Sequence, residues 1–267
     1  MASSNGHGKR DALGKSLRLL RWMLKAPGDE WGVRELAHAV GLPPSTAHRL
    51  LASLEHEGLI ESNPDNDRYR IGLEFYHMAW RAQAKFSVRE LALPFLRRLA
   101  EDSRETAFLA LYDRSRMEMM FAAVVDTQHP YRYILPINEW LPMHAGASGQ
   151  AIMAFLPYED RQVIVRSKGL APVTPLSITD PAALEETLAL VRARGYAISH
   201  GQRIPESVSI AAPIWGPDHR VLGDVAVTMP EHRFGPGVET RLAPLVTISA
   251  ARISDELGGR PPVAAAG

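Results

Sequence analysis

Residues 33–54 read Val-Arg-Glu-Leu-Ala-His-Ala-Val-Gly-Leu-Pro-Pro-Ser-Thr-Ala-His-Arg-Leu-Leu-Ala-Ser-Leu, and this stretch decides the fold of the first part of the chain. Apolar residues recur at steps of three and four on both sides of Gly41-Leu42-Pro43, which predicts two short helices joined by a tight turn. The small Ala37, four residues before Gly41, lets the two helices cross closely. The expected buried side of the second helix consists of Ala47, Leu50, Leu51 and Leu54.

The outer side of the second helix is polar. It begins with short hydrogen-bonding side chains and an arginine, which are the types that contact base edges and phosphates in a major groove. These candidate DNA-binding residues are Ser45, Thr46, His48 and Arg49. Many helix pairs in ordinary domains also have a glycine at the turn, so the pattern alone leaves a purely structural helix pair open.

The residues that follow add a two-stranded ribbon. Residues 59–61 and 69–72 alternate like strands, and residues 63–67, Asn-Pro-Asp-Asn-Asp, have the composition of a turn. A helix-turn-helix followed by such a ribbon is the winged form, and it places Arg68 and Arg70 where they could contact backbone phosphates. The chain as a whole has 30 basic and 30 acidic residues, so a DNA-binding surface must be local.

These residues resemble the IclR family of bacterial transcriptional regulators over about residues 15–256. The motifs that carry the resemblance are Gly41-Leu42-Pro43-x-Ser45-Thr46-Ala47-His48-Arg49-Leu50-Leu51, Gly58-Leu59-Ile60, Arg68-Tyr69-x-Ile71-Gly72, Leu141-Pro142-Met143-His144-Ala145-x-Ala147-Ser148-Gly149 and Ser209-Ile210-Ala211-Ala212-Pro213. The resemblance implies a DNA-binding domain, an effector domain with a GAF-like fold, and homodimers that can pair into tetramers.

The chain divides into two domains and short tails. Residues 1–14 have few apolar side chains and are expected to be disordered, and the tail 258–267 likewise. A winged helix-turn-helix domain is expected over 15–72, with its first helix burying Leu17, Leu20 and Leu24. Residues 73–86 have large apolar groups on more than one side, which predicts a linker helix that also contacts a second subunit.

Residues 87–257 are expected to form an α+β domain with an antiparallel sheet of five or six strands and helices on at least one face. Strands are predicted over 106–112, 117–125, 131–135, 208–215 and 220–229. Helices are predicted from 87 to about 102 and over 146–155, 158–168, 181–194 and 238–257. Pro244 should kink the last helix or mark its true start.

The candidate effector site follows from the alternation of side chains along the last two strands. Bulky residues such as Ile210 and Val227 share one face, while small or polar residues such as Ser209 and Thr228 share the other. The small-residue face leaves room for a ligand or for a closely packed helix. Backbone N–H groups at the start of the helix near Gly146 could receive a carboxylate. The positions that the resemblance implies for the pocket are Gly146, Ala147, Ser199, Ser209, Ala226 and Thr228, with Ser148 beside them.

Two residues depart from the family pattern. Pro44 stands where a lysine or arginine is common, so one DNA contact is expected to be missing. Asp224 stands on the pocket side of a strand where a small apolar residue is usual. A buried carboxylate needs a partner, which we expect to be Arg203, His200 or a donor group of the effector.

Other function classes receive little support from the residues. The chain has no cysteine, so disulfides and thiolate metal sites are excluded, and its histidines have no metal-ligand spacing; we expect neither metal nor cofactor. Residues 146–150 lack the spacing of a nucleophile elbow, so a serine hydrolase built on Ser148 and His144 is a weak alternative. No apolar run is long enough to cross a bilayer and the start does not resemble a signal peptide, so we expect a cytoplasmic protein without membrane contact.

The sequence therefore predicts a ligand-responsive transcription regulator rather than an enzyme. It should bind a palindromic or near-palindromic operator as a homodimer or tetramer, most simply as the repressor of a catabolic operon. Its effector should be a small organic or aromatic acid, as the resemblance implies. The remaining alternative is a small-molecule sensor whose winged domain contacts protein instead of DNA, because the neutral net charge gives no global sign of DNA binding.

Overall fold

A computed structural model describes residues 5–85, 87–126, 133 and 135–261. The chain forms two compact units, residues 1–86 and 87–267, and each is described here by itself. The first unit contains helices α1 (Asn5–Met23), α2 (Val33–Ala39), α3 (Pro44–His56) and α4 (Leu73–Lys85). Its strands are β1 (Trp31–Gly32), β2 (Ile60–Asn63) and β3 (Arg68–Ile71).

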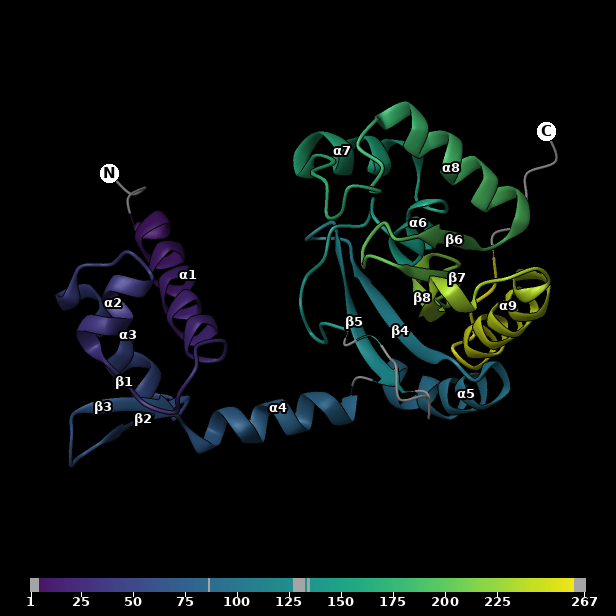
Figure 1. The fold of residues 1–267 in the computed structure, drawn as a ribbon. Coiled ribbons are helices and arrows are strands. Elements are labelled where there is room, and N and C mark those ends of the chain that lie inside the picture. Colours follow the sequence, from purple (N-terminus) through teal and green to yellow (C-terminus); the bar gives the residue numbers. More distant parts are fainter. Residues whose placement is uncertain (1–4, 86, 127–132, 134, 262–267) are drawn as a thin grey trace. The chain divides into compact units, whose positions relative to one another are not determined.

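The predicted helix-turn-helix is confirmed. Gly41 has φ +66°, a left-handed conformation that glycine adopts without strain, and the N–H of Leu42 donates to the carbonyl of Ala37 to close the turn between α2 and α3 (Figure 1). The expected side of α3 is buried, with Ala47 and Leu51 fully inaccessible. Leu51 packs in one cluster with Leu36 of α2 and with side chains of α1, so apolar burial fixes which side of α3 remains exposed.

Helix α1 differs from the sequence prediction in two respects. It begins at Asn5, so the expectation of disorder over 1–14 is wrong for residues 5–14; residues 1–4 lie outside the described residues. Its core side chains are Leu19, Leu20 and Met23, whereas Leu17 and Leu24 are exposed. The sequence prediction relied on leucine spacing alone, so it placed the buried side of α1 about one residue from its position in the structure.

The predicted wing is present and has one more strand than expected. Strands β2 and β3 pair antiparallel, and β1 adds to the other edge of β3 through the pairs Trp31–Tyr69 and Gly32–Arg68. Trp31 and Tyr69 are buried against the helices, so the short β1 ties the start of α2 to the wing. Helix α4 follows with Leu73, Tyr76 and Met78 exposed, and its contact with a second subunit stays a prediction.

The second unit is α+β, as predicted. Its helices are α5 (Ser87–Ser103), α6 (Ala147–Met153), α7 (Tyr158–Lys168), α8 (Pro181–Arg194) and α9 (Val238–Glu256), with the short 3-10 turn η1 (Glu231–Arg233). Strands β4 (Thr106–Asp113), β5 (Glu118–Val125), β6 (Ala197–His200), β7 (Ser207–Trp215) and β8 (Val221–Pro230) form an antiparallel sheet in the order β5-β4-β8-β7-β6. The first strand pair and the last two strands match the predictions closely.

One predicted strand is wrong at its described residues, and one real strand was not predicted. Tyr133 and Leu135 lie in no strand, and the rest of the predicted strand 131–135 is outside the described residues. The fifth strand is instead β6, which pairs with β7 through Ser199–Ser209. Residues 258–260 were expected to be disordered, but Gly259 packs against the backbone of Trp215 and its N–H donates to Ser254; residues 262–267 are outside the description.

Helices cover both faces of this sheet (Figure 1). On one face α5 and α9 pack against the bulky residues of the strands, including Ile210, Val225 and Val227. On the other face α6 and α8 pack against the small residues Ala211 and Ala226. The predicted alternation along β7 and β8 is therefore confirmed, and the small-residue face is the one that α6 approaches.

Candidate functional site

The outer side of α3 is exposed. Ser45, His48 and Arg49 are exposed and Thr46 is partly exposed, while the opposite side of the helix is buried. Pro44 occupies the first helical turn, where its missing N–H costs nothing because that group has no partner within the helix. The four predicted DNA-contacting residues thus lie together on one accessible surface at the start of α3.

The wing arginines are already engaged within the protein. Arg68 donates to the carbonyl oxygen of Glu30 at 2.9 and 3.2 Å and to the carboxylate of Glu35 at 3.1 Å. Arg70 donates to the carboxylate of Glu61 at 3.0 and 3.2 Å. Since exposed ion pairs contribute only about 0–1 kcal/mol, a phosphate could replace either carboxylate at small cost. The sequence prediction named the arginines but not these competing acids.

The wing turn is held by the side chain of Glu30. Its two carboxylate oxygens accept hydrogen bonds from Asn63 and Asn66, both at 2.8 Å. These amide bonds, with the nearby arginines, lower the pKa of Glu30. Glu30 therefore stays ionised at neutral pH and fixes the turn between β2 and β3.

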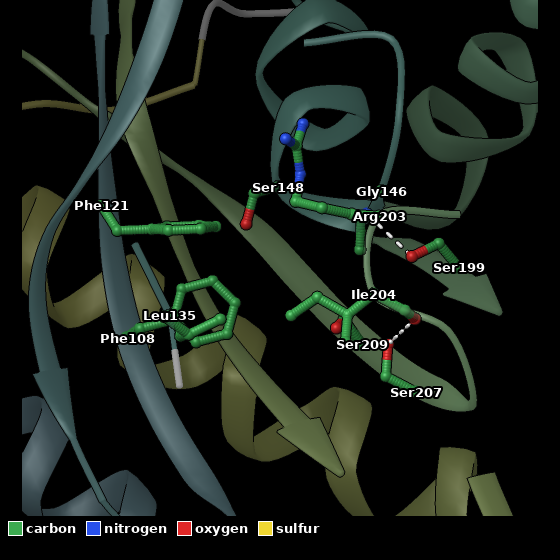
Figure 2. A pocket seen from close by; sticks show the side chains of 11 residues that line it. Phe108, Phe121, Leu135, Gly146, Ser148, Ser199, Arg203, Ile204, Ser207 and Ser209 are labelled. Atoms are coloured by element: carbon green, nitrogen blue, oxygen red, sulfur yellow. Dashed lines mark hydrogen bonds between the residues drawn. The ribbon is translucent and has the colours of Figure 1, made fainter. Parts of the chain in front are cut away.

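The second unit has a pocket between the small-residue face of the sheet, the start of α6 and the loop before β7 (Figure 2). The cavity itself is only about 20 Å³, room for about one water molecule, and the space free of atoms reaches about 330 Å³ only when the open mouth is included. A ligand the size of an aromatic acid therefore requires some side chains to move. The lining residues are Phe108, Phe121, Leu135, Gly146, Ala147, Ser148, Ser199, Arg203, Ile204, Ser207 and Ser209.

Gly146 shapes one wall of this pocket. Its φ of +89° is a conformation that L side chains rarely adopt, and a Cβ there would lie 3.2 Å from Cβ of Arg203. The side-chain oxygen of Gln202 accepts from the N–H of Gly146 at 3.3 Å, and Ser199 Oγ accepts from the N–H of Ala147 at 2.9 Å. These two N–H groups were expected to be open to a ligand carboxylate, but the protein's own side chains already use them.

Asp224 lies behind Ser148 and does not line the pocket. Ser148 Oγ donates to Oδ2 of Asp224 at 2.9 Å, while Oδ1 has no hydrogen-bond partner within the described part of the chain. The side chain is fully buried, and burial raises the pKa of Asp224 to about 8, although the Ser148 hydrogen bond and the charge of Arg203 oppose the rise. At neutral pH most of this carboxyl is therefore protonated.

Arg203 is the cation among the pocket-lining residues. Its Nη2 donates to the carbonyl of Pro142 and, at 2.6 Å, to that of Ala145, so the guanidinium points toward the loop before α6 (Figure 2). Burial lowers the pKa of Arg203 to about 10, so it remains charged at neutral pH. His200 had been considered as a partner of Asp224, but its Nδ1 lies 3.6 Å from the carboxylate of Glu231 instead.

The remaining predicted effector residues lie at two depths. Ser209 lines the pocket and donates to Thr228 Oγ1 at 3.0 Å. Thr228 and Ala226 are buried in β8 beneath the lining residues. Of the eight predicted residues, the structure places Gly146, Ala147, Ser148, Ser199 and Ser209 on the pocket wall and the other three behind it.

The aromatic wall of the pocket was not predicted. Phe108 of β4 and Phe121 of β5 pack edge to face with ring centres 5.0 Å apart. Phe108 pairs with Ala226 in the sheet and so lies on the same face. The alternation argument that was applied to β7 and β8 would have identified Phe108 if it had been extended to β4.

The serine hydrolase alternative does not match this geometry. The hydroxyl of Ser148 bonds to Asp224, whereas Nε2 of His144 bonds to the carbonyl of Ala171 at 2.9 Å. Across the described residues, no group of three His, Cys, Asp or Glu side chains could hold a metal ion. In the same part of the chain, no helix combines the length and apolar character that a membrane crossing needs.

Two family descriptions match the chain. "IclR helix-turn-helix domain" matches residues 12–64, and "Bacterial transcriptional regulator IclR C-terminal" matches residues 81–255. The transcriptional repressor IclR of Escherichia coli (strain K12) is 28% identical over 259 residues, which cover 97% of this chain and 94% of that protein.

Solved structures are similar over nearly the whole chain. A regulator from Silicibacter sp. TM1040, described as a putative ICLR transcriptional regulator, has a TM-score of 0.79 at 28% identity and covers 94% of this chain and 98% of its own. An IclR homolog from Microbacterium hydrocarbonoxydans, complexed with 4-hydroxybenzoate, has a TM-score of 0.77 at 25% identity, with 92% and 98% covered.

Proposed function

Because the chain belongs to the IclR family of DNA-binding bacterial transcriptional regulators, we propose that it represses a catabolic operon and responds to a small organic or aromatic acid. The family consists of regulators and not of enzymes. The single observation that carries the proposal is the exposed polar side of α3 on a buried helix-turn-helix core. We infer that the protein acts in the cytoplasm, where its DNA target is.

In the proposed complex, α3 enters the major groove. Ser45, Thr46, His48 and Arg49 then face base edges, and the arginine can make a bidentate contact with a guanine. Arg68 and Arg70 exchange their carboxylate partners for phosphates. Because proline stands at position 44 in place of a basic side chain, the contacts at the start of α3 are limited to hydroxyl and backbone groups.

Two copies of the chain are proposed to read two half-sites. A two-fold symmetric dimer presents two recognition helices to an inverted or near-inverted repeat. The exposed apolar residues Leu73, Tyr76 and Met78 of α4 support a subunit contact along this helix, because an apolar helix surface in water is a typical interface. A pair of such dimers would form a tetramer.

The proposed effector is a small acid with an apolar or aromatic body. Arg203 can balance the negative charge, and Phe108 with Phe121 provides an apolar wall. The relative that holds 4-hydroxybenzoate supports this ligand class. Ligand control requires that the acid bind more tightly to one arrangement of the two DNA-binding units than to the other.

The proposal is tested by selecting bound sequences from random duplex DNA with the purified protein at two salt concentrations. A symmetric motif is expected, with retention that weakens as salt rises because phosphate contacts release counterions. Arg49→Ala is the matched variant, which should lose the motif but keep part of the salt-dependent retention. No retention of DNA by the wild-type protein would favour the alternative, in which the winged domain contacts another protein.

A further inference from the structure

The carboxyl of Asp224 is placed where an apolar strand residue would pack better. It lies in β8 opposite Ala110 of β4 and Pro213 of β7, with no exposed surface. Oδ2 accepts from Ser148, whereas Oδ1 has no hydrogen-bond partner among the residues that the structure describes. An ionised carboxylate with one unpartnered oxygen is costly in such surroundings, whereas a neutral carboxyl costs much less.

Ser148 connects this carboxyl to the pocket. Its side chain lines the pocket between Phe121 and Arg203 (Figure 2). Its hydroxyl donates to Oδ2 of Asp224, which lies behind it. A serine hydroxyl has one hydrogen to donate and lone pairs that accept. While Asp224 is ionised, the hydrogen of Ser148 is committed to Oδ2, so the pocket meets lone pairs only. Once Asp224 is neutral it can donate to Ser148 Oγ, which leaves the serine hydrogen available to a ligand.

We propose that Asp224 is a proton-binding residue of the pocket: an anionic ligand binds together with one proton on Asp224, and Ser148 then donates its hydrogen to that ligand. The proton comes from solvent and adds to the carboxylate of Asp224, and no other bond changes. The inference rests on the proposed function only in taking the ligand to be an acid. In this proposal Asp224 and Ser148 together make the pocket select for anionic ligands, although Asp224 does not line it.

The charges around Asp224 favour this coupling. The residues that face it from β4, β7 and α6 are Ala110, Pro213 and Ser148, which carry no charge. Arg203, in the loop before β7, is the cation that acts on it. His144 is buried beside Arg203 and its pKa is lowered by burial, so it stays neutral.

Ligand charge and the proton on Asp224 are therefore linked. Burial already raises the pKa of Asp224 to about 8. A second negative charge in the pocket would raise this pKa further and would also interact with the positive charge of Arg203. A group that binds protons more tightly in the complex makes the affinity fall as pH rises through its pKa in the free protein. The affinity for an anion should then be nearly constant below that pKa and decrease by up to about tenfold per pH unit above it.

Calorimetric titration of the full chain with benzoate tests the proposal between pH 6 and pH 9. Benzoate is anionic throughout this range, and benzamide serves as the uncharged probe of the same shape. Repeating each titration in buffers of different ionisation enthalpy counts the protons taken up. We expect benzoate binding to take up close to one proton at the alkaline end, and benzamide binding to take up far less.

Asp224→Asn replaces the carboxyl with a neutral group of the same shape and should make benzoate affinity independent of pH. Asp255→Asn, an exposed aspartate near the end of α9, is the matched control and should keep the wild-type profile. Ser148→Ala should weaken benzoate more than benzamide at acidic pH, because the donor is lost. An unchanged pH profile in Asp224→Asn, or no proton uptake by the wild type, would overturn the proposal.

Two further outcomes are informative. If Asp224→Asn does not fold, carbon NMR of aspartate-labelled wild-type protein follows the same carboxyl directly. One aspartate resonance should then titrate above pH 7 and move to higher pH when benzoate is added; titration of every aspartate below pH 5 would refute the inference. Failure of both probes to bind would also refute it, and selection of a DNA motif by the same sample would show that the regulator function stands regardless.

Discussion

Replacing Asp224 with asparagine should change how the stability of the second unit depends on pH, without any ligand. In the unfolded chain this carboxyl has its ordinary pKa of 3.8, and in the folded protein burial raises the pKa to about 8. Between these values the folded state holds more protons than the unfolded state. The contribution of Asp224 to stability is therefore greatest at acidic pH and is lost as pH rises from about 4 to about 8. Asparagine does not titrate, so the variant lacks this decline.

The magnitude follows from the two pKa values. Each pH unit within the window changes the free energy of unfolding by about 1.4 kcal/mol. Going from pH 5 to pH 8 covers most of three such units, which gives about 3 to 4 kcal/mol for a carboxyl that shifts from 3.8 to about 8. Relaxation around the buried charge would reduce this, so we expect a loss of roughly 2 kcal/mol or more in the wild type relative to the variant.

Urea unfolding at pH 5, 6.5 and 8 measures this difference. Trp215 is buried in the same unit and next to Phe155, so fluorescence reports the loss of its packing. The gap in unfolding midpoint between Asp224→Asn and wild type should widen in favour of the variant as pH rises, while Asp255→Asn should follow the wild type. A constant gap between pH 5 and pH 8 would refute the reasoning, because it would mean that Asp224 is ionised or protonated equally in both states.

Three other substitutions test separate parts of the account. Arg49→Ala should cost about 1–3 kcal/mol of specific DNA binding in a fluorescence titration, and an equal loss on random DNA would show that Arg49 touches only phosphate. Glu61→Gln removes the acid that pairs with Arg70, so binding to random duplex should tighten and its salt dependence should steepen by up to about one counterion, with an unchanged slope counting against a wing contact. Gly146→Ala forces a side chain into φ +89° against Arg203 and should lower stability by about 1–3 kcal/mol in thermal unfolding; wild-type stability would contradict the crowding seen at this wall.

The parts of the fold that the sequence predicts well are those in which local pattern and packing agree. The apolar spacing of Ala47, Leu50, Leu51 and Leu54 both forms α3 and selects its buried side. Helix α8 has the predicted bounds because Asp180 caps its start, accepting from the N–H of Ala183, and Gly195 ends it at φ +84°. These signals lie within a few residues of the element that they define.

The sequence predictions are wrong or incomplete where residues far away in the chain determine the local structure. Strand β6 is only four residues long, and its pairing with β7, rather than its own composition, makes it a strand. The partners of Arg68 and Arg70 are carboxylates fixed by the wing's tertiary structure, so no local pattern reveals them. Helix α1 buries Leu19 rather than Leu17 because the position of α3 selects its buried side.

The candidate pocket shows the same division. Strand alternation and the family resemblance predicted the small residues of α6, β6 and β7 on its wall. Arg203 and Phe121 come from a loop and from a strand at the far side of the sheet, and only the folded chain brings them together. Asp224 was identified as unusual from the sequence, but its partner Ser148 and its unpartnered oxygen are properties of the structure.

We propose that one small acid controls DNA binding by this protein. The most direct measurement is the affinity of the full chain for its selected operator, by fluorescence anisotropy at fixed salt, with and without saturating 4-hydroxybenzoate. We expect a change in affinity of about 5- to 150-fold, the usual range of coupling between two sites, and the same acid should change binding to random duplex much less. An operator affinity that stays the same while calorimetry shows the acid bound would contradict the claim.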